Sequence, residues 1–581
     1  MLQFLKFVGA TVVGLFLFCI LGIFILMGIG ASFSSSEKPD IEENSVLMLN
    51  LSRPIAERST EDPFEGLNLP INNTPTKLGL LEIIQSIKNA KNDKKIKGIY
   101  INTEGVSSGY AALKEIRDAL VDFKKSNKFI YAYGEYYTEG AYYLSSVADK
   151  IYLNPIGLVE FNGLYSEVPF IKGVLEKLEV RPEIFRVGEF KSAIEPLMLD
   201  KMSDANRLQV TSYLNSIYDV YLKDISLSRK IEASKLRQIS DSMLVRKPED
   251  ALTYQLITNV GYEDEILEIL RKDLKVDKKE KIKFITINNY YKSIESKYSK
   301  NKIAVLFAEG DINSGRSTDE SIGSETIVNE LRKLRKDDKV KAIVLRINSP
   351  GGSALASDVM WREIMLTRKE KPVIASMSNV AASGGYYMAM ACDTIVAQEN
   401  TITGSIGIFG VLFNAENLLK NKIGVTTDRV TTGKYSDIGN PVRPITAQER
   451  QIIQENIERG YETFTTKAAQ GRKMSVENLK KIASGRVWSG SQAKENGLVD
   501  VIGGLDVAIE IAAKKAKITE YQPKYYPVQQ DFFAKLSGKS KEETLIREQL
   551  GEETYLYYKT LQKIKNLQGV QARLPFDLVI R

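Results

Sequence analysis

The sequence predicts an α/β fold made of two tandem repeats, preceded by one transmembrane helix. The chain has 581 residues, more than one hydrophobic core usually spans, so at least two domains are expected. Three sequence blocks recur in the same order, 242 to 245 positions apart, which indicates an internal duplication. In each copy an amphipathic helix precedes a strand-like apolar run, the alternation that βαβ units produce.

The first element is an uncharged apolar run over residues 7–31. A cleavable secretory signal would have a core of about 7 to 15 apolar residues ending at a small-residue site, whereas this run is about 25 residues long. We therefore expect residues 1–40 to be an uncleaved membrane anchor and linker. Lys6 precedes the run, so the positive-inside rule predicts a single-pass protein of the inner membrane with its later domains on the periplasmic side.

Each repeat opens with a helix followed by a buried strand. In the first copy the pattern predicts a helix over residues 78–91 and a strand within residues 93–101. In the second copy it predicts a helix over residues 324–335 and a strand within residues 337–345. Both strands are apolar on both faces, which is typical of parallel sheets covered by helices.

Two further blocks complete the duplication. Residues 139–143 read Glu-Gly-Ala-Tyr-Tyr, and residues 383–387 read Ser-Gly-Gly-Tyr-Tyr. Residues 251–261 correspond to residues 493–503 through shared Ala, Leu and Gly positions. The common order and offset argue against chance similarity.

These blocks set the expected domain boundaries. Residues 41–295 form the first αβ repeat and residues 296–525 the second. Residues 526–581 form a C-terminal extension, in which residues 541–565 have helical periodicity with many Glu and Lys. We interpret that stretch as a peripheral or assembly helix, not as a site.

Composition excludes several function classes. The 80 basic and 73 acidic residues nearly balance, and no basic block with interleaved aromatics is present, so nucleic acid is not an expected partner. With no histidine and only Cys19 and Cys392, the chain cannot assemble a Cys/His metal site. We expect no cofactor, and the chain has no Walker A motif for ATP.

The two copies differ in a complementary way. Where the second copy has Ser383, the first has Glu139. About 52 residues further on, the first copy has Lys191 where the second has Ser436. One copy thus keeps a serine and the other a lysine, so a single composite Ser/Lys site would explain both losses. With no histidine in the chain, a nucleophilic serine needs a different base.

Each candidate also has a structural explanation. A serine before two glycines is often a turn or a helix N-cap, and a lone lysine is usually solvated. Ser405 could simply stabilise a turn through a hydrogen bond from its hydroxyl to the backbone. Gly351 and Gly352 could simply let the chain turn before a helix over residues 355–368. The tyrosines of the block at 383–387 are expected to pack in the core.

Several motifs together resemble signal peptide peptidase A, the protease IV family, in its long duplicated bacterial form. They are the Gly-Glu-Phe-Lys-Ser-Ala stretch at 188–193, the turn at Ser383, the stretch Thr-Gly-Ser-Ile-Gly-Ile at 403–408 and Arg-Val-Trp-Ser-Gly at 486–490. The resemblance implies the Clp protease and crotonase fold in both repeats, a closed homo-oligomer, a tetramer in that family, and a membrane-anchored serine endopeptidase that degrades cleaved signal peptides and other apolar, membrane-associated peptides.

The resemblance also implies a role for each site residue. It makes Ser383 the nucleophile, Lys191 the general base and Ser405 the hydroxyl that orients the lysine. The implied oxyanion hole consists of Gly351, Gly352 and Gly384.

A lysine acts as a base only when it is neutral, so its pKa must fall by roughly three units from about 10.4. Burial must supply that shift, and the apolar neighbours of Lys191 suit a desolvated pocket. Glu189 and Glu195 would oppose it, so we expect both carboxylates to point away.

Two alternatives of other classes stay open at this level. A crotonase-like acyl-CoA enzyme would use the same backbone amides, but CoA esters are cytoplasmic and the domains are expected outside. A non-catalytic membrane scaffold could keep the fold without the chemistry. The apolar run at 406–413 is expected either to line a substrate groove or to be a buried strand. Sequence does not say whether Lys191 and Ser383 meet within one chain.

Overall fold

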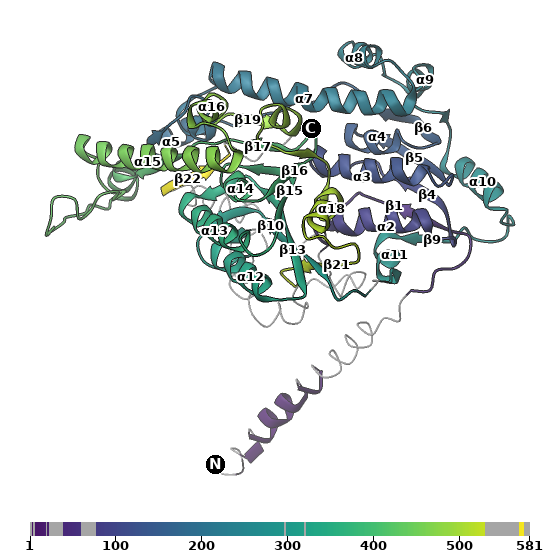
Figure 1. The fold of residues 1–581 in the computed structure, drawn as a ribbon, viewed down its shortest axis with the longest axis horizontal. Helices are drawn as coiled ribbons and strands as arrows, with labels where there is room; N and C mark the ends of the chain where they lie inside the picture. Colours follow the sequence, from purple (N-terminus) through teal and green to yellow (C-terminus); the bar gives the residue numbers. More distant parts are fainter. Residues whose placement is uncertain are drawn as a thin grey trace.

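The structure is a computed structural model of the chain. It describes residues 3, 6–7, 9–18, 20–22, 39–59, 77–295, 298–318, 321–528 and 569–574. The body contains one sheet from each repeat, the first parallel throughout and the second parallel except for one antiparallel edge strand, and a third sheet to which both repeats contribute. Figure 1 shows the two repeats side by side, with the long helix α7 running above elements of both.

The first sheet has six strands, all paired in parallel, in the order β8-β6-β5-β4-β1-β9. Its strands are β1 (Ser45–Leu49), β4 (Ile96–Asn102), β5 (Phe129–Tyr137), β6 (Lys150–Val159), β8 (Asn259–Val260) and β9 (Phe284–Thr286). Helices α2 (Leu80–Asn92), α3 (Tyr110–Lys124) and α4 (Glu139–Ser145) cover one face, and α10 (Glu263–Leu274) covers the other. Alternate residues of β4 face opposite cores, Ile99 and Ile101 toward the first and Tyr100 toward the second.

The second sheet repeats this plan. Its order is β19-β17-β15-β13-β10-β21, with β16 on β15 and β20 on β16. Its strands are β10 (Lys302–Glu309), β13 (Val340–Ser349), β15 (Val373–Ala382), β16 (Thr394–Ala397), β17 (Ile402–Gly404), β19 (Val487–Ser489), β20 (Val501–Ile502) and β21 (Gln522–Tyr526). Helices α12 (Ser324–Lys336), α13 (Ala354–Thr367) and α14 (Gly384–Ala389) pack on one face and α18 (Leu505–Lys515) on the other.

The predicted helix–strand pairs are therefore confirmed in both copies, with boundaries shifted by no more than four residues. Helix α2 begins two residues later than expected, after the short strand β3 (Leu78–Gly79), which pairs with β2 (Ile55–Ala56). Strand β13 runs to Ser349, four residues past its expected end, because the chain stays extended up to the turn at Pro350.

The third sheet joins the repeats. Its order is β12-β11-β14-β22-β18-β7, from β7 (Arg181–Arg186), β11 (Asp311–Asn313), β12 (Ser321–Gly323), β14 (Gly351–Ser353), β18 (Phe409–Asn414) and β22 (Gly569–Arg573). Strand β7 of the first repeat pairs antiparallel with β18 of the second along six residues. Because of this pairing, the chain segment that follows β7 lies against the second repeat.

Helix α7 (Asp204–Arg229) fixes the two repeats together from above (Figure 1). The Val487 N–H donates to Gln209 Oε1 at 3.1 Å, and Gln492 Nε2 donates to Ser212 Oγ at 3.0 Å. The remaining elements are α5 (Lys172–Lys177), η1 (Ser192–Ile194), α6 (Glu195–Met198), α8 (Ala233–Asp241), α9 (Pro248–Thr253), α11 (Ile287–Ser293), η2 (Leu418–Ile423), α15 (Ala447–Arg472), α16 (Val476–Ile482) and α17 (Gly490–Glu495).

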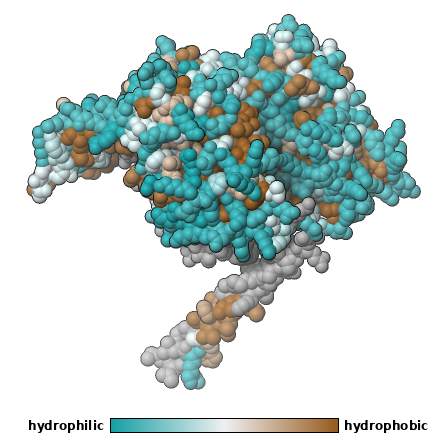
Figure 2. All heavy atoms as spheres, viewed as in Figure 1, coloured by the Kyte–Doolittle hydropathy of each residue, from teal (hydrophilic) through white to brown (hydrophobic). Residues whose placement is uncertain are grey.

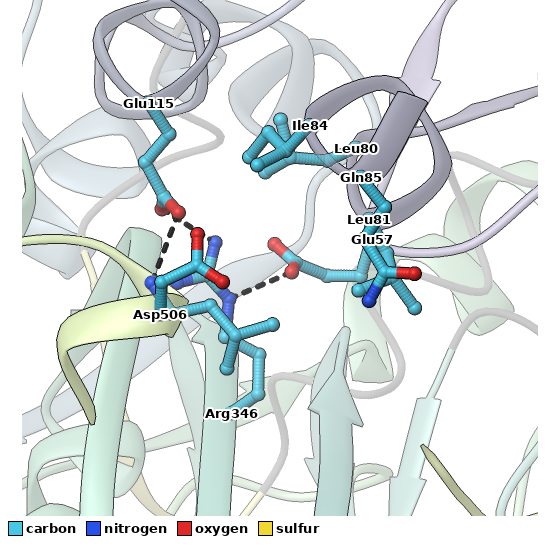
Figure 3. A pocket seen from close by; sticks show the side chains of 9 residues that line it. Glu57, Leu80, Leu81, Ile84, Gln85, Glu115, Arg346 and Asp506 are labelled. Carbon is cyan, nitrogen blue, oxygen red and sulfur yellow. Dashed lines mark hydrogen bonds and ion pairs between the residues drawn. The ribbon is translucent and has the colours of Figure 1, made fainter. Parts of the chain in front are cut away.

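A buried charge cluster lies where the repeats meet. Arg346 of β13 is fully buried, and its guanidinium pairs with Glu57 at 2.7 Å and with Glu115 of α3 at 2.7 Å (Figure 3). Further bonds from Arg346 to the Ser376 and Ser378 hydroxyls and to the Met377 carbonyl satisfy its remaining donors. The charged residue stands inside the apolar run of β13, a signal that the sequence analysis did not use.

Part of the predicted anchor and all of the predicted C-terminal helix fall outside the described residues. Of the run at 7–31, the helical residues 7, 9–18 and 20–22 are described, and their large apolar side chains, apart from the partly buried Ile20, are exposed on a helix that projects from the body (Figures 1 and 2). Within the described ranges, no helix has both the length and the apolar character needed to cross a bilayer. Residues 541–565 are not described, but residues 569–573 form strand β22, which the sequence analysis did not predict.

Candidate active site

Ser383 stands at a sharp turn between strand β15 and helix α14. Its φ of 55° and ψ of −109° are a strained combination for a residue with a side chain. Its N–H donates to the Gly404 carbonyl at 2.8 Å, and its carbonyl accepts from the Tyr387 N–H at 2.8 Å. The side chain makes no capping bond to the helix although it occupies the N-cap position. The turn therefore presents the hydroxyl away from α14, as a nucleophile elbow does.

Lys191 reaches that hydroxyl from the first repeat. The residue follows β7, is completely buried, and places its Nζ 2.9 Å from Ser383 Oγ. Lys191 Nζ also lies 2.9 Å from Ser405 Oγ and 3.1 Å from the Ser405 carbonyl oxygen. Three residues predicted from different repeats thus meet, and they meet within one chain.

The backbone around Lys191 is packed too closely for larger residues. A Cβ on Gly485, where φ is +81°, would lie 2.7 Å from both the Cβ and the backbone nitrogen of Lys191. The Phe190 N–H donates to the Ser484 carbonyl at 3.0 Å, next to that glycine. Only glycine at 485 lets the two segments approach, and the sequence analysis missed this residue.

Burial lowers the pKa of Lys191 well below its usual value. Within the described part of the chain no carboxylate counteracts this shift, because Glu189 is exposed and Glu195 accepts hydrogen bonds from Ser203 and Asn206. Both glutamates point away, as expected. A neutral amine has a lone pair that can accept the proton of the Ser383 hydroxyl while its own hydrogens bond to Ser405.

Replacing Lys191 with methionine is expected to make the protein more stable near pH 7. The unfolded chain binds a proton at Lys191 below about pH 10.5, whereas the native chain holds it neutral down to its lowered pKa. The wild type therefore loses free energy of unfolding as pH falls through that window, and Lys191→Met does not. Urea unfolding at pH 7 and at pH 10 should show an advantage for the variant that shrinks at the higher pH; a constant difference would contradict it.

Of the three glycines proposed for the oxyanion hole, Gly351 lies close to Gly384, whereas Gly352 lies against the backbone of Ile312. Gly351 and Gly352 have φ values of +102° and +154°, which L-residues with side chains rarely adopt. A Cβ placed on Gly351 would be 2.7 Å from the Gly384 nitrogen and 2.1 Å from the carbonyl oxygen of Ala572. The Gly351 N–H itself donates to Ser349 Oγ at 3.1 Å. A carbonyl group thus already lies beside the Gly384 amide, and it comes from β22.

The counterpart positions lie outside this cluster. Glu139 is buried at the start of α4, where it accepts the N–H groups of Asn162 and Gly163 at 2.9 and 2.7 Å. Ser436 is exposed and donates to the Gly433 carbonyl at 2.6 Å. Both residues have local structural roles.

The two tyrosines that follow the nucleophile turn pack in the core, as expected. Tyr386 and Tyr387 are buried on α14, and their hydroxyls donate to the Leu498 carbonyl and to Asp358. Of the apolar run at 406–413, the last five residues belong to strand β18, whose one edge pairs with β7 and whose other pairs with β22. Across the described part of the chain, no group of three or more His, Cys, Asp or Glu residues could hold a metal ion.

Comparison with known families agrees with this duplicated architecture. The pattern of Peptidase family S49 matches residues 122–277 and again residues 365–519. The chain belongs to peptidase family S49. A second pattern, that of Clp protease, matches residues 294–401 of this S49 peptidase, the part that contains β13, Gly351, Gly352 and Ser383.

Three curated relatives of this S49 peptidase cover most of its length. Protease 4 of Salmonella typhi is 36% identical, over 90% of this chain and 86% of its own. The chloroplastic serine protease SPPA of Arabidopsis thaliana is 34% identical, over 82% of this chain and 70% of its own. Protease 4 of Haemophilus influenzae is 35% identical, over 85% and 83%. The chain is thus a serine peptidase with tandem S49 domains, and the acyl-CoA enzyme and the inert scaffold are set aside.

Proposed function

We propose that this protein hydrolyses peptide bonds with Ser383 as the nucleophile and neutral Lys191 as the general base. The supporting observation is the 2.9 Å separation of Lys191 Nζ and Ser383 Oγ in a pocket where burial lowers the lysine pKa. Ser405 orients the amine through its hydroxyl and its carbonyl. A positioned base of this kind typically contributes a factor of about 10² to 10⁴ to the rate.

The proposed reaction proceeds in two stages. Lys191 takes the Ser383 proton while Oγ attacks the substrate carbonyl, and backbone amides at Gly352 and Gly384 stabilise the tetrahedral oxyanion, because the Gly351 N–H already donates to Ser349 Oγ. The Lys191 ammonium then protonates the leaving amine, which frees the first product. A water molecule, deprotonated by the same lysine, hydrolyses the acyl-serine ester.

The proposal extends to substrate and location. The uncharged run at 7–31 supports a single-pass anchor in the cytoplasmic membrane, with the S49 domains on the periplasmic side. An anchored peptidase meets apolar, membrane-released peptides first, so we assign cleaved signal peptides and similar segments as substrates. We further propose a homo-oligomer, of four chains, that encloses the sites and protects folded proteins.

A fluorophosphonate probe tests the nucleophile. The wild-type chain and a Ser436→Ala variant should become labelled and hydrolyse an apolar peptide in detergent, because Ser436 lies in an exposed loop. Ser383→Ala should lose both labelling and hydrolysis while its circular dichroism stays unchanged. Persistent labelling of folded Ser383→Ala would reject Ser383 as the nucleophile.

A further inference from the structure

Strand β15 leads the chain into the nucleophile turn, and its pairing is irregular just before that turn. The register between β13 and β15 shifts there, so that residues 378–380 of β15 lie opposite the single residue Asn348 of β13. Such a β-bulge next to an active site re-aims the side chains that follow it. Here the bulge ends shortly before Ser383, so whatever holds the bulge also helps to place the nucleophile.

The side chain in the middle of the bulge contacts the first repeat. Asn379 Oδ1 accepts a hydrogen bond from the Ala112 N–H of helix α3 at 2.9 Å. Ala112 lies in the first turn of α3, where backbone N–H groups have no partner within the helix. Asn379 therefore caps a helix of the repeat that supplies Lys191, and it does so from the strand that supplies Ser383.

The second copy caps its corresponding helix in a different way. There Ser353 precedes α13, and its hydroxyl accepts the Ala356 N–H at 3.3 Å. The aligned residues of the first copy lie 244 positions earlier and are Gly109 and Ala112. Gly109 has no side chain that could cap α3, so Asn379 of the other repeat takes over the role of that serine.

Glycine at position 109 also leaves the space that Asn379 occupies. A Cβ on Gly109 would lie 2.5 Å from both Cγ and Oδ1 of Asn379. The backbone of Gly109 is extended, with a φ of −76°, which any residue can adopt. Space, and not backbone conformation, therefore requires the glycine. The residue of the first copy that aligns with Asn379 is Glu135, whose side chain is exposed.

The chain between the bulge and the nucleophile stays in contact with the first repeat. The side chains of Val380 and Ala382 pack in the hydrophobic core of that repeat. Between them, the Ala381 carbonyl accepts a hydrogen bond from Thr403 Oγ1 at 2.7 Å. Because these residues are held in succession, a displacement of the bulge is transmitted along the strand to Ser383.

We propose that Asn379 is a positioning residue for the dyad. By capping α3 it holds the nucleophile strand against the first repeat, so that Ser383 Oγ stays within reach of Lys191 Nζ. This inference rests on the proposed function of Ser383 and Lys191, whose side-chain atoms lie 2.9 Å apart. A misplacement of reacting groups by about 1 Å can cost a factor of about 10² in rate, so a cap distant from the chemistry can control it.

Two substitutions of Asn379 test the cap. Asn379→Ala removes the acceptor and should slow fluorophosphonate labelling of Ser383 by at least about tenfold, with kcat falling alike and KM little changed. Asn379→Asp keeps an acceptor, and Asp caps helices as well as Asn does, so labelling should stay near the wild-type rate. Glu135→Ala, at the exposed counterpart position, should have no effect. A folded Asn379→Ala chain labelled at the wild-type rate would overturn the proposal.

Gly109→Ser separates positioning from the stability of the helix. The serine supplies a local cap like that of Ser353, so the urea unfolding midpoint should not lie below that of Asn379→Ala, in which α3 is uncapped. Its Cβ enters the space of the Asn379 side chain and should displace the bulge, so labelling and kcat should fall. If Gly109→Ser is labelled as fast as the wild type, Asn379 does not position the nucleophile.

The pH dependence of labelling distinguishes this inference from the catalytic proposal. In Asn379→Ala the rate at high pH should fall while the midpoint stays, because Lys191 remains buried. Wild-type rates at every pH in this variant, together with a Ser383→Ala chain that is not labelled, would reject the role of Asn379 alone. Labelling that persists in Ser383→Ala would reject the nucleophile and with it the positioning role.

Discussion

The Lys191→Ala variant is expected to lose a factor of about 10² to 10⁴ in kcat/KM on an apolar peptide, the contribution typical of a positioned general base. Lys191 Nζ is the base within reach of Ser383 Oγ, and the chain has no histidine that could substitute. The loss should fall on kcat, because the amine contacts the reacting hydroxyl and not the substrate. Steady-state kinetics in detergent measure it.

A matched lysine controls for nonspecific effects. Lys172 lies in the same repeat and pairs with Asp200 on the surface, so Lys172→Ala should keep wild-type kinetics. Circular dichroism and the unfolding midpoint should show that Lys191→Ala remains folded. A folded Lys191→Ala enzyme with near wild-type kcat would exclude the proposed dyad.

Arg346→Ala is expected to lower the free energy of unfolding by about 3–5 kcal/mol, the range for breaking a buried ion pair by removing one partner. Its loss leaves the carboxylates of Glu57 and Glu115 buried without their cation at the junction of the repeats (Figure 3). Burial already raises the pKa of Glu115, so an unpaired carboxylate there is costly. Denaturant unfolding of the purified chain measures the change.

Two comparison variants show whether the loss of stability comes from leaving buried carboxylates without their cation. Arg332 pairs with Glu363 but is 56% exposed, so Arg332→Ala should cost no more than about 1 kcal/mol. Combining Arg346→Met with Glu57→Leu and Glu115→Leu should recover most of the stability, because no charge is then left unpaired. If Arg346→Ala unfolds with the wild-type midpoint, the cluster does not hold the repeats together.

Local sequence patterns predicted the helix–strand pairs α2–β4 and α12–β13, because each of these helices and strands carries its own periodicity. The meeting of Lys191 and Ser383 was predictable for a different reason: the duplication left complementary losses at Glu139 and Ser436. Neither the local sequence patterns nor the duplication could show that Lys191 and Ser383 meet within one chain. That depends on the antiparallel pairing of β7 with β18, which joins residues more than 200 positions apart.

The missed features are of the same long-range kind. Arg346 was visible as a charge inside an apolar strand, but its partners Glu57 and Glu115 come from segments 289 and 231 residues away. Strand β22 is five residues long and belongs to a sheet completed by β14 and β18, so no local alternation identifies it. Gly485 was unremarkable in sequence because its requirement arises only from the approach of Lys191.

The central claim is that neutral, buried Lys191 activates Ser383, and the pH dependence of Ser383 acylation by a fluorophosphonate tests it most directly. The base is the deprotonated form, so the wild-type labelling rate should rise with pH through a midpoint well below the usual lysine pKa of 10.5. Lys191→Met should be labelled far more slowly, with no such midpoint. A Lys191→Met chain labelled at the wild-type rate, with the same midpoint, would contradict the account.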